Sequence, residues 1–354
     1  MAQLSRRAVV AGGSGLMWAQ TAAPLKLPQK VKLAVIGVEG HLGEVKEALP
    51  ALPDVEVVAA MHATPEKARR QFPKAKIYSD YRKMLDENKA DLVAVCNTNG
   101  ERAEAVLECT RRGVHIIAEK PLGVTFEEMG KVSQAVRASK GKITTLFPMR
   151  FSPEYLALRQ VVQSGAIGEV VQVGTQKSYR APAPGDWRLN KDLYGGTIPW
   201  IGIHMVDLMR FVTGREFTEA FSMQSVLDFG KTATMESVTA SVFKMDNRGL
   251  AMLRMDYFRP KAAPTHGDDR MRVVGSQGVL EYMAATGITL VTEDKPPEVI
   301  RDLPAPRHLF IEFLEHIYNS KPEPISWRDI ERANYICLHA KRSGETGRPE
   351  RCAG

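Results

Sequence analysis

The chain has 354 residues, of which 44% are hydrophobic and 25% are charged, a composition typical of a globular protein long enough for two domains. No segment approaches the roughly 18 consecutive apolar residues of a transmembrane helix, so integral membrane association is not expected. The formal net charge of +7 is spread among acidic residues, which argues against a nucleic-acid partner. The four cysteines lack the spacing of a metal site, which predicts free thiols and no bound metal.

Residues 1–29 are predicted to precede the first domain as an export signal or a disordered tail. Ser5-Arg6-Arg7 comes before a weakly apolar stretch from Ala8 to Ala19, and this arrangement resembles a twin-arginine signal. Because that route carries folded proteins, it suits a protein that folds around a cofactor. We therefore expect a periplasmic protein, and a disordered tail on a cytoplasmic protein is the alternative.

Residues 30–150 show the alternation of a parallel sheet with helices on both faces. Thr64-Pro65 begins one helix, Gly113 ends another, and Thr125 with Glu128 forms a capping box. The runs expected to form strands are residues 31–36, 55–61, 75–78, 92–96, 114–118 and 143–147. This segment is predicted to be an α/β, Rossmann-type dinucleotide-binding domain.

Residues 151–354 follow a different pattern and are predicted to form a second α/β domain with a large, mostly antiparallel open sheet. A helix begins at Ser152-Pro153, another covers about residues 197–212, and two more, about 309–319 and 327–343, close the chain. The expected strands, separated by turn residues, are residues 170–173, 220–229, 238–245, 249–257, 271–274 and 279–282.

The first strand leads into a glycine-rich turn from residue 37 to residue 43. Glycine lets backbone amides approach a pyrophosphate, and the start of the following helix favours negative charge. The spacing is GxxGxxG, one residue longer than the usual GxGxxG. We interpret the turn as a cofactor-binding loop, and a tight turn with packing glycines is the alternative. Its candidate cofactor-binding residues are Gly37, Glu39, Gly40, His41, Leu42 and Gly43.

The end of the second strand lacks the acidic residue that usually holds the ribose hydroxyls of NAD. The turn there reads Met61-His62-Ala63-Thr64, with no carboxylate to repel a 2′-phosphate. His62 can hydrogen-bond either form of the ribose, so NAD and NADP are equally admissible as cofactors. The alternative for His62 is an exposed turn residue.

The fifth strand ends in Ala118-Glu119-Lys120-Pro121, at the edge of a parallel sheet where ligands bind. A lysine beside a cofactor can steer a developing alkoxide or move a proton. A solvated surface lysine is the alternative for Lys120.

The segment from Gly113 to Leu122 resembles the EKP signature of the Gfo/Idh/MocA oxidoreductases, and the resemblance covers nearly the whole chain from Val31. It implies that Lys120 reaches the nicotinamide and the substrate hydroxyl, and that the chain forms a homo-oligomer. Further matching motifs, in the family's order, are Asn97-Thr98-Asn99, Arg150-Phe151-Ser152-Pro153, Ser164 to Val170, Asp186-Trp187-Arg188, Gly195-Gly196 and Gly202 to Asp207. The resemblance adds Asn97, Thr98, Asn99, Glu119 and Lys120 to the candidate cofactor-binding residues.

Four residues of the helix near residue 200 share one face, because Trp200, His204, Asp207 and Phe211 are spaced i, i+4, i+7 and i+11. A histidine with a pKa near neutrality can take the proton from a hydroxyl as hydride leaves its carbon. The resemblance gives His204 that catalytic role, and a buried structural histidine is the alternative. Asp207 is expected to orient or pack rather than to catalyse.

The chain departs from the family pattern at Trp200, because the family commonly has an aspartate one helical turn before the histidine. The lost carboxylate would bind hydroxyls and favour imidazolium. Indole instead offers an apolar face that can stack on a sugar ring or block the pocket. The substrate-side candidates are Arg150, Tyr179, Trp187, Arg188, Trp200 and Asp207.

We predict an NAD- or NADP-dependent oxidoreductase that transfers hydride to or from a hydroxyl-bearing carbon of a sugar, cyclitol or derivative. One alternative is a redox-neutral sugar-processing enzyme, such as a glycosidase or epimerase with bound nicotinamide. The other is a non-catalytic dinucleotide-binding sensor in which Trp200 prevents turnover.

Overall fold

The computed structural model describes residues 24–352 except 231 and 233. The predicted twin-arginine segment lies outside the described residues. The fold begins earlier than residue 30, because Leu27 is buried in the core and the Leu25 amide donates to the Ala51 carbonyl. Residues 25–27 therefore belong to the first domain rather than to a tail.

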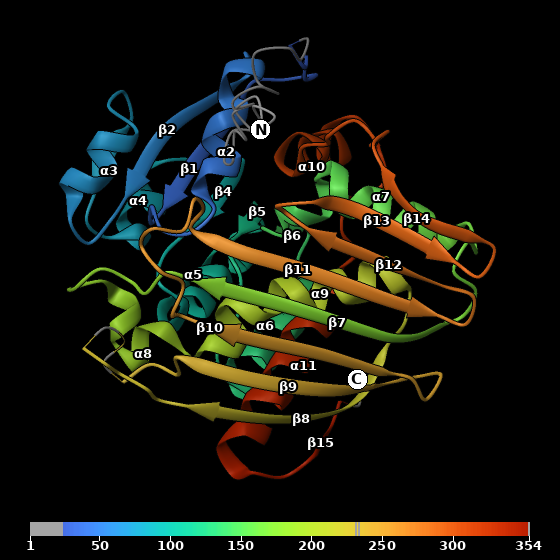
Figure 1. Ribbon diagram of the computed structural model, residues 1–354. Helices are drawn as coiled ribbons and strands as arrows, with labels where there is room; N and C mark the ends of the chain where they lie inside the picture. The colour runs from blue at the N-terminus through green and yellow to red at the C-terminus, as the bar shows by residue number, and fades with distance from the viewer. Residues whose placement is uncertain (1–23, 231, 233, 353–354) are drawn as a thin grey trace, which may run out of the picture.

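The first domain is built on a six-stranded parallel sheet in the order β3-β2-β1-β4-β5-β6 (Figure 1). Its strands are β1 (Val31–Ile36), β2 (Val55–Met61), β3 (Lys76–Tyr78), β4 (Leu92–Val95), β5 (His115–Ala118) and β6 (Ile143–Thr145). Its helices are α2 (Leu42–Ala48), α3 (Pro65–Gln71), α4 (Tyr81–Glu87), α5 (Asn99–Arg111) and α6 (Phe126–Ala138). The central strands are buried on both faces, as apolar runs without alternation predict. The predicted strands and the capping box of Thr125 and Glu128 are confirmed.

The second domain carries a nine-stranded sheet in the order β14-β13-β12-β11-β7-β10-β9-β8-β15. Every neighbouring pair is antiparallel except β7 with β10, so the predicted mostly antiparallel sheet is confirmed. Its strands are β7 (Val170–Tyr179), β8 (Phe217–Ser225), β9 (Val238–Met245), β10 (Leu250–Asp256), β11 (Gly267–Gly275), β12 (Gly278–Met283), β13 (Gly287–Thr292), β14 (Lys295–Ile300) and β15 (Glu350–Arg351).

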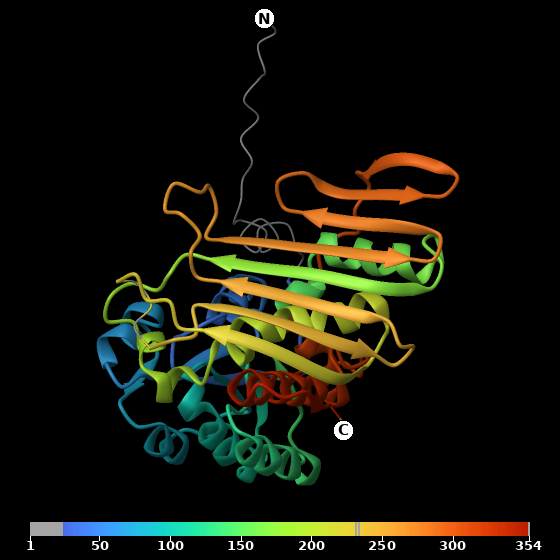
Figure 2. The same cartoon turned by 60° about the horizontal axis from the view of Figure 1, so that its bottom comes forward.

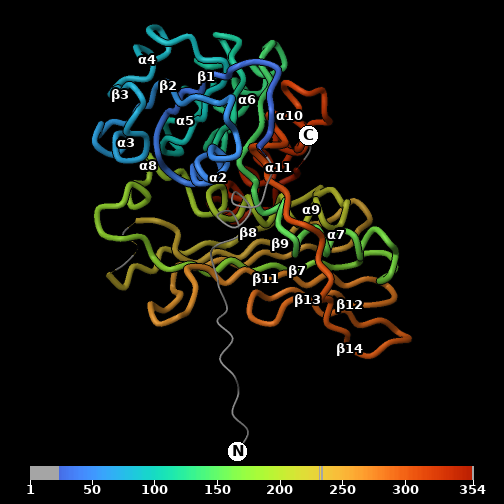
Figure 3. Tube along the Cα trace, turned by 90° about the horizontal axis from the view of Figure 1, so that it is seen from above, coloured from blue at the N-terminus to red at the C-terminus, as the bar shows by residue number. Residues whose placement is uncertain are grey.

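Helices fill the space between this sheet and the first domain, and the other face of the sheet is open (Figures 2 and 3). They are α7 (Pro153–Gln163), α8 (Lys191–Tyr194), α9 (Ile203–Thr213), α10 (Leu309–Tyr318) and α11 (Trp327–Thr346). Helix α11 packs on β8, α9 and α6, while α10 packs on α2 of the first domain. The two C-terminal helices therefore join the domains rather than covering the second domain alone.

Two elements of the second domain, β7 and the helix near residue 200, differ from the sequence prediction. Strand β7 extends to Tyr179, whereas the sequence predicted its end at residue 173. The prediction was too short because the later inward-facing residues, Thr175 and Lys177, are polar and hide the alternation of apolar and polar residues. The helix near residue 200 begins with a π-helical turn, Ile198–Gly202, before α9. Such turns often occur at functional sites.

No helix among the described residues is both long and apolar enough to cross a membrane.

Candidate active site

A cleft of about 870 Å³ opens at the carboxyl ends of β1, β2 and β4. Strand order reverses between β1 and β4, which is where ligands bind in open α/β sheets. On the opposite side the cleft is bounded by the loop of the second domain that carries Gly185, Trp187 and Leu189. The cleft therefore lies between the two domains, and its size suits a nucleotide.

Two glycines shape the loop after β1. Gly37 and Gly40 have φ of +76° and +64°, a left-handed backbone that favours glycine. A Cβ on Gly37 would lie 2.4 Å from the Cys96 carbonyl oxygen, and one on Gly40 would lie 2.1 Å from Glu119 Oε1. Gly43 has neither constraint and sits in the first turn of α2, beside the buried Leu42. Gly37 and Gly40 are therefore required by the close packing of the loop on Cys96 and Glu119, and of the two only Gly37 lines the cleft.

Glu39 corrects the expectation that no carboxylate lies near the end of the second strand. Its Oε1 is 3.2 Å from His62 Nε2, and its Oε2 accepts from Trp187 Nε1 at 3.0 Å. Glu39, His62 and Trp187 all line the cleft. His62 is mostly buried here and so is not an exposed turn residue. The sequence could not reveal this contact, because it depends on the path of the loop across 23 positions.

The loop after β4 divides into residues that face the cleft and a residue that supports it. Asn97 and Thr98 line the cleft, and Asn97 Oδ1 is buried without a hydrogen-bond partner in the described structure. Asn99 is fully buried and does not line the cleft; it donates to the Tyr194 carbonyl at 2.8 Å and accepts from Arg102 NH1 at 2.8 Å. Asn99 therefore anchors the loop instead of presenting a group to a cofactor.

Glu119 is fully buried and binds the glycine-rich loop through His41. Its Oε1 accepts from the His41 amide at 2.5 Å and also contacts His41 Nδ1. Burial by itself would raise its pKa, but the charges of His41, Lys120 and Arg102 outweigh burial and lower the pKa of Glu119 to about 2. Glu119 is therefore an ionised positioning group beneath the loop.

Lys120 is buried under Trp200. Its Nζ donates to the Trp200 carbonyl at 2.6 Å and lies 3.2 Å from the centre of the Trp200 ring. Burial lowers the pKa of Lys120 well below its usual value, and Arg102, Lys177 and Arg188 add to that effect while Glu119 opposes it. Lys120 is therefore not a solvated surface lysine. Asn334 of α11 fixes the loop that follows by accepting from the Leu122 amide at 2.9 Å.

His204 lies near Lys120 on the first turn of α9. Its ring contacts those of His41 and Phe147 with centroids 4.9 Å and 6.2 Å away. Burial lowers the pKa of His204 well below its usual value, and the charges of Lys120, His41 and Lys177 lower it further. His204 Nδ1 is buried with no hydrogen-bond partner among the described residues. A neutral imidazole with an unfilled position is suited to accept a proton.

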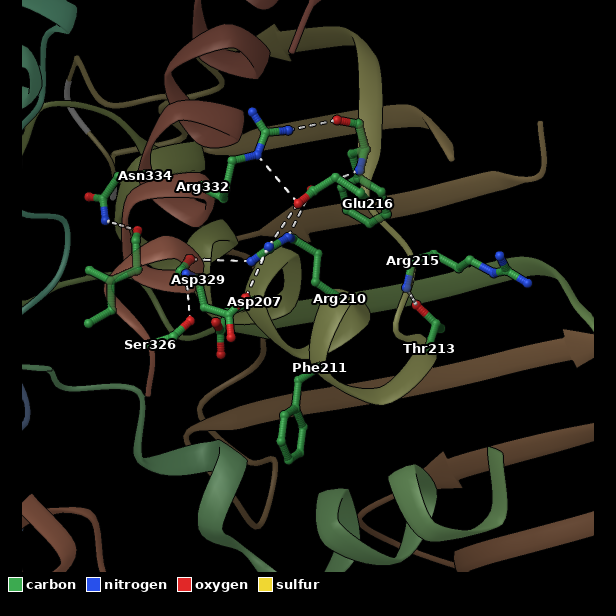
Figure 4. Close-up of polar contacts among 12 residues, drawn as sticks. Asp207, Arg210, Phe211, Thr213, Arg215, Glu216, Ser326, Asp329, Arg332 and Asn334 are labelled. Carbon is green, nitrogen blue, oxygen red and sulfur yellow. Dashed lines mark hydrogen bonds and ion pairs between the residues drawn. The ribbon is translucent and has the colours of Figure 1, made fainter. Parts of the chain in front are cut away.

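Two of the six substrate-side candidates bind each other. Arg150 Nε and NH2 donate to Asp207 Oδ2 and Oδ1 at 2.7 Å and 2.6 Å, and both side chains are buried. Arg150 also contacts Asp329, which binds Arg210 next to Glu216. Figure 4 displays Asp207 beside this ion-pair network between α9 and α11. The structure gives Arg150 and Asp207 an architectural role, because their polar atoms are already paired with protein groups.

Of the other candidates, Trp200 and Arg188 lie near Lys120. Trp187 packs edge-on against Trp200, with ring centroids 5.5 Å apart. Arg188 is bound by its own neighbour Asp186 at 2.6 Å and 2.7 Å, and its charge lowers the pKa of Lys120. Tyr179 contacts the ring of His266, with centroids 4.9 Å apart. These aromatic and cationic groups form the wall opposite the first domain.

Sequence reasoning missed Lys177 and Asp269 in this wall. Lys177 is fully buried, its Nζ donates to Asp269 Oδ2 at 2.7 Å, and Asp269 Oδ1 is buried without a partner in the described part of the chain. Burial alone would lower the pKa of Lys177, but Asp269 raises it. The signal that could have found Lys177 is a polar residue at an inward position of a strand.

The residues present fit a dinucleotide. The cleft lies at the point where strand order reverses, Gly37 and Glu39 of the glycine-rich loop line it, and Asn97 offers an unfilled acceptor. Within the described residues no group of three or more His, Cys, Asp or Glu side chains gathers in a way that could hold a metal ion. Fold and cleft together define a two-domain oxidoreductase that uses a nicotinamide dinucleotide.

Comparison with known proteins identifies the group more narrowly. Residues 31–147 match the oxidoreductase family with an NAD-binding Rossmann fold, and residues 155–281 match the GFO/IDH/MocA C-terminal domain. The chain belongs to the Gfo/Idh/MocA family of NAD(P)-dependent oxidoreductases, as the sequence resemblance predicted.

Three relatives illustrate the similarity. Myo-inositol 2-dehydrogenase of Thermotoga maritima is 24% identical over 335 residues, which cover 90% of this chain and 97% of that protein. D-glucoside 3-dehydrogenase of Escherichia coli is 29% identical over 230 residues, 62% of each chain. A Thermotoga maritima protein of solved structure, assigned as an oxidoreductase, is 30% identical with a TM-score of 0.85, covering 91% of this chain and 100% of its own.

Proposed function

We propose that the enzyme transfers hydride between NAD(P) and a hydroxyl-bearing carbon of a sugar, cyclitol or derivative. The observation that carries the proposal is the pair of Lys120 and His204, buried together with both pKa values lowered by burial. Perturbed titratable groups beside a ligand cleft are characteristic of acid–base sites. The relatives that act on myo-inositol and on D-glucosides support this substrate class.

In this proposal a dinucleotide held by Gly37, Asn97 and Thr98 would supply the hydride-transfer chemistry that interconverts an alcohol and a carbonyl. His204 Nδ1, which has no protein partner within the described residues, takes the hydroxyl proton. Lys120 Nζ leaves the Trp200 carbonyl and donates to the substrate oxygen, where it stabilises developing negative charge. Glu119 and Asn334 hold the backbone on either side of Lys120.

Trp200 and Trp187 supply an aromatic surface where the family commonly has a carboxylate. The Trp200 ring lies over Lys120 and the Trp187 ring packs against it, and indole faces bind the apolar faces of sugar rings. We propose that substrate is held partly by stacking rather than by a carboxylate that accepts its hydroxyls.

The reaction is tested by denaturing the purified protein, identifying any released nucleotide, and screening sugars and cyclitols for NAD(P)H formation. Net change in NAD(P)H absorbance together with an oxidised sugar is expected. Product formation with no net change would contradict dehydrogenation and favour the redox-neutral alternative. If the wild-type protein bound dinucleotide but turned over no sugar, and Trp200→Asp gained turnover, the result would favour the non-catalytic sensor.

We also propose that the open face of the nine-stranded sheet pairs two copies of the chain. Val171, Val242, Leu250 and Met252 are exposed there, beside a trough of about 610 Å³ that also exposes arginines and Glu281. Apolar side chains among charges of both signs suit a twofold self-complementary interface. Light scattering should give the mass of a dimer or larger oligomer, and Met252→Asp should yield monomer; a monomeric wild type would contradict the proposal.

Export through a twin-arginine route is a further proposal, supported only by Ser5-Arg6-Arg7 and the stretch after it. Replacing both arginines with lysine should retain the protein in the cytoplasm, as cell fractionation would report. Unchanged fractionation would contradict export by this route.

A further inference from the structure

The loop after β1 is one residue longer than the common dinucleotide-binding loop, and Glu39 occupies the lengthened part. Left-handed glycines lie on both sides of it, at Gly37 and Gly40, so the loop turns sharply before and after Glu39. The Glu39 amide donates to the Cys96 carbonyl at 2.8 Å, which fixes the backbone of the loop on β4. Glu39 therefore projects from a defined backbone position.

His62 holds the Glu39 side chain at the end of β2. The Thr64 amide donates to His62 Nδ1 at 2.7 Å, so Nδ1 is an acceptor and the neutral ring carries its proton on Nε2. His62 Nε2 can then donate to Glu39 Oε1, 3.2 Å away. The turn between β2 and α3 thus orients the histidine, and the histidine brings a carboxylate to the strand end that lacks an acidic residue of its own.

The cations near this carboxylate are already paired. Lys67 Nζ is 3.7 Å from Glu39 Oε1, and Arg82, which also lines the cleft, is bound to Glu104. A 2′-phosphate entering here would meet the Glu39 carboxylate without an unpaired arginine or lysine among these groups to neutralise it. Two ribose hydroxyls would instead find an acceptor that the protein holds in place.

We propose that Glu39 replaces the missing acidic residue of β2, binds the adenosine ribose hydroxyls, and makes the enzyme selective for NAD over NADP. The selectivity arises from a residue in the glycine loop rather than at the strand end. The proposal rests on dinucleotide binding and is independent of the substrate and of the roles of Lys120 and His204.

The experiment measures the affinities of NAD⁺ and NADP⁺ for the purified full chain by isothermal titration calorimetry. Wild-type protein should bind NAD⁺ at least about 30-fold more tightly, because like charges brought together are strongly unfavourable. Glu39→Gln keeps the size of the side chain and removes its charge. We expect it to weaken NAD⁺ and strengthen NADP⁺, so that the ratio of affinities falls by about tenfold or more.

Two control variants separate this role from others. Glu66→Gln removes an exposed carboxylate in the first turn of α3 that does not line the cleft, and it should leave the ratio within about twofold. Trp187→Phe removes the donor to Glu39 Oε2 while keeping an aromatic ring. It tests whether the only role of Glu39 is its contact with the second domain. In that case Trp187→Phe and Glu39→Gln would each change the affinities for NAD⁺ and NADP⁺ by the same factor.

Several outcomes would overturn the proposal. The proposal would be wrong if wild-type protein bound NAD⁺ and NADP⁺ with equal affinity. It would also be wrong if wild-type protein preferred NADP⁺ and lost that preference in Lys67→Ala. A ratio unchanged by Glu39→Gln in protein with a wild-type circular dichroism spectrum would also exclude it. Failure of both nucleotides to bind would instead contradict the proposed function, so the two failures are distinguishable.

Discussion

Helix α9 carries buried polar groups of two kinds. At its start, His204 has a buried nitrogen without a partner in the described structure and lies near Lys120, whose pKa burial lowers strongly. One turn further along, Asp207 is bound by two nitrogens of Arg150. Although both groups are buried, His204 leaves hydrogen-bonding capacity unused and Asp207 has its capacity satisfied. Unused capacity in a buried titratable group indicates chemistry, while satisfied charge indicates architecture.

Changes at the start of α9 and at Lys120 should have the largest effect on activity. Lys120→Ala and His204→Gln should each lower kcat by roughly 10²–10⁴-fold, up to about 5 kcal/mol of transition-state stabilisation. Neither should change dinucleotide affinity by more than about threefold, because neither side chain lines the cleft. Steady-state kinetics with the identified substrate and calorimetry with NAD⁺ provide the two measurements. Turnover equal to wild type in Lys120→Ala would remove that residue from the mechanism.

Asp207→Asn should affect stability instead. The substitution leaves the buried Arg150 guanidinium with only Asp329, 3.3 Å away, as an anionic partner. We expect a loss of about 3 kcal/mol in the free energy of unfolding, measured by urea denaturation.

The matched control removes both charges. Arg150→Met with Asp207→Leu should recover most of the lost stability, because no unpaired charge remains. If Asp207→Asn proved as stable as wild type but bound substrate poorly, Asp207 would belong to the pocket and the comparison would fail.

Glu119 extends the comparison of unsatisfied and satisfied buried groups, because its charge is paired although it lies next to Lys120. Its folded-state pKa of about 2 lies below the value of 4.5 expected when unfolded, so its contribution to stability is present above pH 4.5 and is lost as pH falls toward 2. The contribution is up to about 3 kcal/mol, from 1.36 kcal/mol per pKa unit. Glu119→Gln should therefore flatten the dependence of urea unfolding on pH over this window. An unchanged slope would mean that Glu119 is not held by His41 and Lys120.

Trp200→Phe should have the smallest effect. The backbone carbonyl that binds Lys120 and an aromatic face over its Nζ both remain, so kcat should stay within about twofold. Loss of the indole area should raise KM by about three- to tenfold, because stacking on substrate weakens. A kcat reduced about 100-fold with unaltered KM would instead give the indole a direct part in the reaction.

The first domain was predictable from sequence because its signals are continuous. The apolar run of residues 31–36, the glycine turn and the EKP motif each lie within a few residues, and their order along the chain determines where they meet on a parallel sheet. Asn97 and Thr98 follow the same rule and line the cleft.

The substrate side was less predictable because its contacts join distant segments. Arg150 and Asp207 are both polar and near catalytic motifs, yet they satisfy each other across 57 positions. The sequence did not indicate Lys177 as a site residue, because the polar residues around it are typical of a loop. The segment is a strand because it pairs with β10 and β11. The proximity of Glu39 and His62 depends on one extra residue in a turn, whose path no periodicity reveals.

The position of α10 and α11 has a consequence for synthesis of the chain. These helices are synthesised after all six strands of the first domain, yet α10 packs on α2 and Asn334 of α11 holds the backbone next to Lys120. A nascent chain that has emerged only as far as β6 therefore has an incomplete nicotinamide end and uncovered apolar helix surface. Nucleotide can stabilise the enzyme fully only after α11 has been synthesised, and premature termination anywhere before α11 should yield a product that proteases remove.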